Sequence, residues 1–262
     1  MVRSEKLINF EPVQNMKLKY LKEKWDKFGK IDPLWAILTN PRKKGNKWQI
    51  DEFFETGINE IETVIEHIES SEISIQNKKA LDFGCGVGRL TQALSKYFDE
   101  IHGVDIAPSM IELANYYNRF GNKCKYHLNE EDNLEIFSDY FFDFIYSTLT
   151  LQHMKPKYSK SYIKEFLRIL KPHGLLIFQI PSEPSRTIIG LIIHYIPSIF
   201  YDIIVKMKYI NRPLMDIYWI RKEDIIKFIN QNGGEILSIE ENQRAGKHFI
   251  SYNYFVRKCE CI

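Results

Sequence analysis

The chain has 262 residues, of which 44% are hydrophobic and 27% are charged, and its formal net charge is +2. This composition is typical of a globular protein in water, and the length allows one large domain with appendages. A charge so close to neutral argues against a nucleic-acid partner, and the short basic run at 42–47 indicates a solvated loop. The four cysteines lack the spacing of zinc ligands, so we expect no metal site and reduced thiols in the cytoplasm.

Two segments bear on membranes. Residues 1–12 lack the apolar core of a signal peptide. Residues 188–210 are rich in isoleucine, but polar residues interrupt them before they reach the ~18–20 apolar residues that a membrane span needs. We expect a helical lid there, with shallow peripheral membrane contact as the alternative.

The N-terminal part, residues 1–77, is expected to form a helical cap. Apolar residues follow helical spacing from 57 to 68, and a second helix is expected at 17–30. Between them, 32–41 indicates a compact turn with a short helix that ends at a proline.

From residue 78 to the end, short apolar runs alternate with helical periodicity, which predicts βα units and a parallel sheet. Strands are expected at 78–83, 100–106, 124–128, 141–149 and 175–180, and helices at 89–98, 108–119 and 158–170. An apolar insertion at about 183–220 interrupts the alternation. A helix at 222–232 and two closing strands, at 235–240 and 248–258, complete the domain predicted for 78–262.

The stretch LDFGCGVGRL, residues 81–90, places Gly84, Gly86 and Gly88 between the first predicted strand and its helix. Such a turn lets the backbone approach a ligand because no side chain intervenes. Asp82 precedes the turn, and we expect its carboxylate to point into the ligand crevice beyond the strand.

Two further acidic positions follow the next two strands. Asp105 ends the second strand, where a carboxylate can accept both hydroxyls of a ribose, and the acidic loop 129–132 follows the third. A nicotinamide dinucleotide is the competing ligand, but it requires Gly-x-Gly-x-x-Gly spacing and a helix N-terminus open to the pyrophosphate. The observed spacing is Gly-x-Gly-x-Gly, and Asp82 adds negative charge, so a ligand with a ribose, an adenine and a cationic amino-acid end fits better.

At this point a family becomes recognisable. ALDFGCGVGRLTQAL resembles the first motif of the class I S-adenosylmethionine-dependent methyltransferases, and GVDIAPSMIELA resembles their post-first motif. YFFDFIYSTLTLQHM and FLRILKPHGLLIFQIP resemble the motifs of the fourth and fifth strands. The resemblance covers about residues 78–182. It implies an α/β Rossmann-like fold, with a seven-stranded mixed sheet sandwiched by helices, and S-adenosylmethionine as the cofactor.

The resemblance also implies a set of cofactor-binding residues after the first four strands. They are Asp82, Gly84, Cys85, Gly86, Gly88, Asp105, Ile106, Met110, Glu130, Glu131, Ser147 and Leu149. In this assignment Asp82 and Gly84 face the methionine end, Asp105 binds the ribose, and Glu130 lies at the adenine edge. Asn129 and Glu130 replace a more usual Gly-Asp, so the adenine contact can shift by one residue.

The acceptor is less well defined by the sequence. His153 follows the fourth strand, close to where the methyl group should emerge, and is the candidate catalytic base. An Asn/Asp-Pro-Pro-Tyr/Phe motif typical of nucleic-acid methyltransferases does not occur after the fourth strand. We therefore expect a cytoplasmic O-methyltransferase of a small molecule or glycan. The alternatives are a C- or N-methyltransferase of a lipid or natural-product intermediate, and a non-catalytic cofactor-binding subunit.

Overall fold

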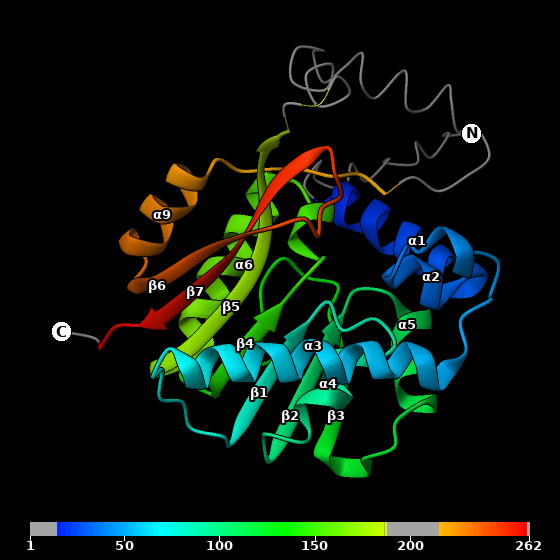
Figure 1. The fold of residues 1–262 in the computed structure, drawn as a ribbon, viewed down its shortest axis with the longest axis horizontal. Helices are drawn as coiled ribbons and strands as arrows, with labels where there is room; N and C mark the ends of the chain where they lie inside the picture. Colours follow the sequence, from blue (N-terminus) through cyan, green and yellow to red (C-terminus); the bar gives the residue numbers. More distant parts are fainter. Residues whose placement is uncertain (1–14, 186, 188–214, 261–262) are drawn as a thin grey trace, which may run out of the picture.

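The computed structural model describes residues 15–185, 187 and 215–260, and within these ranges seven strands form one sheet in the order β3-β2-β1-β4-β5-β7-β6 (Figure 1). The strands are β1 (Lys79–Phe83), β2 (Glu100–Asp105), β3 (Cys124–Leu128), β4 (Phe142–Ser147), β5 (Leu170–Pro184), β6 (Gly234–Asn242) and β7 (Phe249–Lys258). Neighbours among β1 to β5 pair in parallel, whereas β7 is antiparallel to both β5 and β6. The predicted mixed sheet is confirmed. Because parallel strands share one direction, the carboxyl ends of β1 to β4 meet at one edge.

Helices cover both faces of this sheet. They are α1 (Asn15–Ile31), α2 (Pro33–Ile37), α3 (Ile50–Ser70), α4 (Arg89–Leu94), α5 (Pro108–Tyr116), α6 (Pro156–Ile169) and α9 (Lys222–Gln231), with 3-10 turns at Pro41–Lys43, Gly121–Lys123 and Leu151–His153. Side chains alternate along a strand, and β1 shows the consequence. Leu81 and Phe83 belong to the core that α6 and α9 cover, whereas Ala80 belongs to the core beneath α3 and α4.

A third apolar cluster attaches the N-terminal helices to the sheet. Phe28 of α1, Leu34 of α2 and Phe53 of α3 pack with Met110 of α5. These side chains are buried, and Asp26 of α1 accepts a hydrogen bond from the Ser109 backbone at 2.9 Å. Helix α1 therefore lies against α5, with α2 beside it, and α3 joins this cluster through Phe53.

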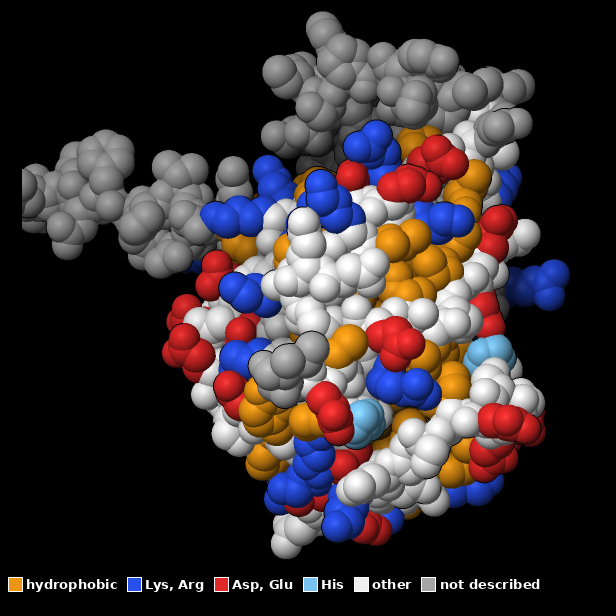
Figure 2. All heavy atoms as spheres, turned by 90° about the vertical axis from the view of Figure 1, so that its left-hand side faces the viewer, with side chains coloured by type: hydrophobic (Ala, Val, Ile, Leu, Met, Phe, Trp, Pro, Cys, Tyr) orange, Lys and Arg blue, Asp and Glu red, His pale blue; other side chains and the backbone are white. Residues whose placement is uncertain are grey.

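The β6 edge of the sheet faces the viewer in Figure 2. Acidic and basic side chains are interspersed with apolar ones on this face, and neither the acidic nor the basic side chains form a continuous patch. Glu235 of β6 pairs with Arg257 of β7, and Glu240 pairs with His67 of α3. Charged side chains on an edge strand oppose pairing with a further chain.

Several predicted boundaries are wrong. The helix expected at 89–98 ends at Leu94, because residues 95–97 bond to carbonyls three residues back and tighten the last turn. The strand expected at 175–180 begins at Leu170 and ends at Pro184. Phe142 pairs with Leu170 and Phe144 with Leu175, so residues 171–174 bulge out between the two pairs. The insertion expected at 183–220 lies outside the described residues, apart from 183–185, 187 and 215–220. Within the described ranges, no helix is long and apolar enough to cross a membrane.

Candidate active site

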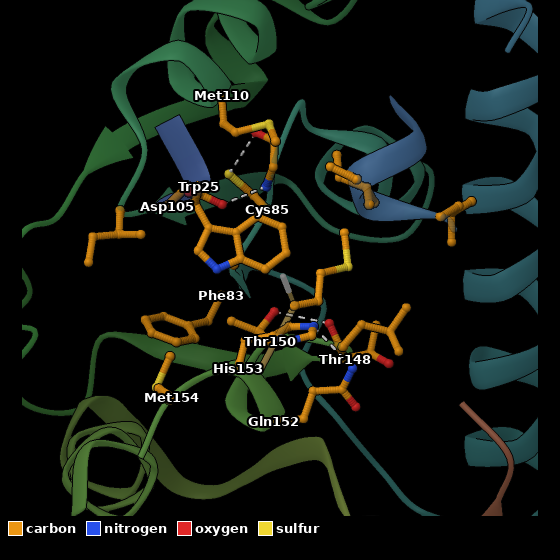
Figure 3. A pocket seen from close by; sticks show the side chains of 18 of the residues that line it. Trp25, Phe83, Cys85, Asp105, Met110, Thr148, Thr150, Gln152, His153 and Met154 are labelled. Atoms are coloured by element: carbon orange, nitrogen blue, oxygen red, sulfur yellow. Dashed lines mark hydrogen bonds between the residues drawn. The ribbon is translucent and has the colours of Figure 1, made fainter. Parts of the chain in front are cut away.

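A cavity of about 540 Å³ lies at the carboxyl ends of β1, β2 and β4. Its wall includes Phe83 and Gly84 at the end of β1, Asp105 at the end of β2, Thr148 after β4 and Trp25 of α1. Figure 3 shows the Trp25 ring between the Asp105 side of the cavity and the His153 side. The volume lies within the roughly 300–1,000 Å³ of small-molecule and cofactor sites.

The glycine turn forms the floor of this cavity with backbone rather than side chains. Gly84, Gly86 and Gly88 have φ angles of 79°, 52° and 85°, a region that L side chains rarely adopt. A Cβ on Gly84 would lie 2.1 Å from the Thr150 hydroxyl, and one on Gly86 would lie 2.5 Å from Ile37. At Gly84 and Gly86, both the close neighbouring side chains and the positive φ angle therefore require glycine.

Asp105 connects the turn to the end of β2. One carboxylate oxygen accepts the Gly86 N–H at 2.9 Å, and the other accepts the Ala107 N–H at 2.9 Å. Burial raises the pKa of Asp105, and the backbone hydrogen bonds oppose that rise. Each carboxylate oxygen can accept a second hydrogen bond, so the side chain can bind donors from the cavity while it holds the turn.

The glycine turn and Asp105 lie within residues 81–178, which match the family model for a methyltransferase domain. This part of the chain is a methyltransferase domain. Its seven-stranded mixed sheet is the fold that the resemblance to the class I, S-adenosylmethionine-dependent methyltransferases implied.

Curated relatives share this domain. The chain is 31% identical to phosphoethanolamine N-methyltransferase 1 of Zea mays over 131 residues, which are 48% of this chain and 25% of the relative. It is 30% identical to demethylmenaquinone methyltransferase of Staphylococcus aureus over 138 residues, which are 50% of this chain and 56% of the relative. The matched segment thus spans between a quarter and about half the length of these relatives.

Solved structures share the fold over more of the chain. Magnesium protoporphyrin IX methyltransferase from Synechocystis PCC 6803, with bound SAH, superposes with a TM-score of 0.60 at 16% identity, covering 92% of this chain and 99% of that one. A methyltransferase from Clostridium acetobutylicum gives a TM-score of 0.53 at 19% identity, covering 76% of this chain and 90% of that one. These similarities show the fold.

Asp82 of the methyltransferase domain does not line the cavity, contrary to the expectation from sequence. Its side chain shares the strand face of Ala80, beneath α4, where the carboxylate accepts a hydrogen bond from the Thr91 hydroxyl at 2.7 Å. The side chain is 1% exposed, and burial raises its pKa to about 7. Strand alternation therefore directs Asp82 into the core and not into the crevice.

The residue of the β3 loop that lines the cavity is Asn129, one position before the predicted acidic pair. Asn129 is buried, and its amide donates to the carbonyls of Glu131 and Asn133. Glu130 forms an ion pair with Lys22 of α1 at 2.6 Å instead. Of these three residues, Asn129 is therefore the one that faces the cavity, which is the one-residue shift that the unusual Asn-Glu pair allowed.

The other predicted cofactor residues divide into two groups. Cys85, Ile106, Met110 and Leu149 line the cavity together with the glycine turn. Gly88 and Ser147 do not line it, and each supports the turn from outside. Gly88 packs against Tyr126, leaving no space for a side chain, and the Ser147 hydroxyl donates to the Phe83 carbonyl at 3.0 Å.

His153 lies on the cavity wall, in the 3-10 turn after β4. Its Nδ1 lies 2.7 Å from the Asp216 carbonyl, which only accepts, so the proton belongs on Nδ1. Nε2 then accepts from the Gln152 amide at 3.1 Å, and Gln152 in turn accepts from Gln179 of β5. Burial lowers the pKa of His153 to about 4, so the ring is neutral at pH 7 and is a weak base.

Sequence reasoning assigned no role to three residues of the site. Trp25 of α1 packs edge-on against His153, with 5.1 Å between the ring centroids. Lys24, also of α1, is buried and pairs with Asp216 at 2.8 Å, which joins the cap to the segment that holds His153. Arg244, in the loop between β6 and β7, lines the cavity as well. An aromatic residue beside a lysine in the helix expected at 17–30 is the sequence pattern that could have indicated Trp25 and Lys24. No comparable pattern in the sequence indicates Arg244.

Proposed function

We propose that the protein is an S-adenosylmethionine-dependent methyltransferase that acts on a small organic acceptor, at oxygen. One observation carries the proposal: the glycine turn and Asp105 form one continuous, hydrogen-bonded edge of a cavity large enough for a cofactor. The cofactor supplies a methyl group on a positively charged sulfur. The chain supplies binding, orientation and exclusion of water.

The cavity residues fit this cofactor. The backbone at Gly84 and Gly86 would hold the methionine end, because both glycines line the cavity and present no side chain to a ligand. Asp105 would accept the ribose hydroxyls through its remaining acceptor capacity. Ile106 and Met110 would pack beside the adenosine, with Asn129 at the adenine edge.

The relatives and structural neighbours support a small-molecule acceptor. They are named as methyltransferases of phosphoethanolamine, demethylmenaquinone and magnesium protoporphyrin IX. These molecules differ widely in size and polarity, and a cavity with aromatic and aliphatic walls such as Trp25 and Met154 is compatible with an organic acceptor. A screen for the methyl acceptor should therefore include small organic hydroxy compounds, acids, amines and saccharides.

Two measurements test the proposal. Isothermal titration calorimetry with S-adenosylmethionine, with NAD as the control ligand, should give binding of the first alone; the reverse preference would refute the cofactor assignment. An acceptor screen that detects S-adenosylhomocysteine release then separates an enzyme from a non-catalytic subunit. The atom that carries the new methyl group in the product decides between oxygen, nitrogen and carbon.

His153 is the proposed base for an oxygen acceptor. His153→Ala should reduce turnover while cofactor affinity changes little, because Trp25 lies between the His153 ring and the Asp105 side of the cavity (Figure 3). The pKa of about 4 makes this histidine a weak base, so we expect a loss at the lower end of the usual general-base contribution, about 100-fold. The matched control is His173→Ala, because His173 is an exposed histidine that pairs with Glu260. Equal turnover in the two variants would remove His153 from the mechanism.

A further inference from the structure

A second polar cluster borders the cavity, away from Asp105. Glu60 of α3 forms ion pairs with two guanidiniums, those of Arg89 at the start of α4 and of Arg244 in the β6–β7 loop. The Tyr146 hydroxyl donates to the same carboxylate at 2.9 Å. Residues from four distant parts of the chain therefore share one carboxylate.

This cluster carries an excess of positive charge. Burial raises the pKa of Glu60, but Arg89 and Arg244 outweigh that effect and hold the pKa below its usual value. The carboxylate is therefore ionised at pH 7, and one negative charge is divided between two guanidiniums. Arg89 is 3% exposed, and its Nε–H is buried without a hydrogen-bond partner. The buried Asp82 carboxyl also interacts with Arg89, but its pKa is raised to about 7, so the two guanidiniums still exceed the negative charge around them. Buried cations with an incomplete counter-charge are costly unless a further anion approaches them.

Arg244 is the member of the cluster placed to meet such an anion. Both arginines line the cavity, but the Arg244 side chain is 33% exposed and is the more accessible of the two. Its Nη1 lies 3.4 Å from Thr148 Oγ1, directly after β4. Thr148 also lines the cavity, and because its oxygen accepts from Arg244, its own O–H can donate to a ligand.

We propose that Arg244 and Thr148 form a subsite for an anionic group, a carboxylate or a phosphate, on the methyl acceptor. Glu60 is a positioning residue that fixes the guanidinium and leaves its remaining N–H groups for the ligand. A guanidinium binds the planar oxygens of these anions through two N–H groups at once, which fixes orientation as well as charge. The inference rests on the proposed function, because it assigns the acceptor to the β4 side of the cavity and the cofactor to the β1 and β2 side.

Inorganic phosphate and acetate are the probes that test this subsite. The protein is first saturated with S-adenosylhomocysteine, so that the carboxylate of the cofactor product already occupies its own position. Each anion is then titrated by calorimetry, with an expected dissociation constant on the order of millimolar. Arg244→Gln should weaken anion binding about tenfold or more, Arg244→Lys should retain part of it, and the affinity for S-adenosylhomocysteine should stay the same in both variants.

The control is Arg257→Gln, which removes an arginine that pairs with Glu235 on the β6–β7 ribbon and does not line the cavity. Thermal unfolding of each variant verifies that it folds. Anion binding that Arg244→Gln leaves unchanged overturns the inference, and so does a wild-type complex that binds neither probe. A loss of S-adenosylhomocysteine affinity in Arg244→Gln, with anion binding intact, places Arg244 on the cofactor and also overturns it. If the wild-type chain binds no S-adenosylhomocysteine, the proposed function itself fails, and the subsite falls with it.

Discussion

The two sides of the cavity are built by different means. The side proposed for the cofactor consists of strand ends and a glycine turn, and its key hydrogen bonds join backbone N–H groups to Asp105 within 20 residues or so of chain. The side proposed for the acceptor consists of side chains from distant segments, with Lys24 bound to Asp216 and Glu60 bound to Arg244. A backbone-built site tolerates little change because glycine conformation and strand geometry set it. A site that is formed by side chains can change its chemistry by substitution while the fold remains. This is consistent with the different acceptors named among the relatives and structural neighbours.

The largest effect is expected at the glycine turn. Gly84→Ala places a Cβ 2.1 Å from Thr150 at a φ of 79°, so the turn must move. We expect the affinity for S-adenosylmethionine to fall by about 100-fold or more, measured by calorimetry. Gly121→Ala is the control, because Gly121 also has a positive φ but no neighbouring atom within 4 Å. It should lower stability by ~1 kcal/mol and leave binding intact. Equal binding by both variants would show that the backbone does not define this side of the site.

A smaller loss is expected from Asp105→Asn. The amide can accept one of the two backbone N–H groups, but its NH₂ then faces the other donor. Cofactor affinity should decrease by about 10- to 100-fold, which is the contribution of hydrogen bonds to a charged group. Asp143→Asn is matched to it, since the Asp143 carboxylate is buried and also accepts a backbone N–H, that of Lys79, but it lies at the amino end of β4. That variant should lose stability and keep its cofactor affinity; the opposite result would contradict the assignment of Asp105.

The acceptor side can be tested through the link between the cap and His153. A double-mutant cycle of Lys24→Met and Asp216→Asn, measured by urea unfolding, should give a coupling energy of about 1–2 kcal/mol, because the Lys24 side chain is only 6% exposed. The same cycle on the exposed pair Lys96 and Glu62 should give less than about 0.5 kcal/mol. Similar coupling energies in the two cycles would mean that the Lys24–Asp216 pair does not hold α1 to the segment that contacts His153.

The pH dependence of stability separates Asp82, in the core beneath α4, from His153, on the cavity wall, by its sign. The pKa of Asp82 rises from 3.8 to about 7 in the folded protein, so its contribution to stability is lost as the pH increases through that window. The pKa of His153 falls from 6.5 to about 4, so its contribution is lost as the pH decreases through that window. Asp82→Asn should make the free energy of unfolding increase more steeply with pH between 4 and 7, and His153→Gln should flatten it. Each change is at most about 1.4 kcal/mol per pH unit. Slopes that shift in the same direction would contradict this assignment.

Much of the cofactor side could be predicted because its signals are local. The first strand, the glycine turn and the following helix lie within 79–94, and the carboxyl ends of parallel strands must meet. Gly84, Asp105 and Met110 were therefore correctly placed at one edge. Asp82 and Glu130 were misplaced by a single step each. Alternation along β1 turns Asp82 beneath α4, and Lys22, distant in sequence, draws Glu130 away from the cavity. Both errors concern the direction of a side chain and not the position of an element.

The sequence by itself determined the α/β architecture, the βα rhythm and the glycine turn, because local periodicity and the conformational demands of glycine act over a few residues. Only the tertiary structure decided which polar groups face the cavity. Arg244 meets Glu60 across 184 residues, and His153 takes its tautomer from the carbonyl of Asp216, 63 residues away. Contacts at that separation depend on how packed layers meet, and no pattern within one segment encodes them.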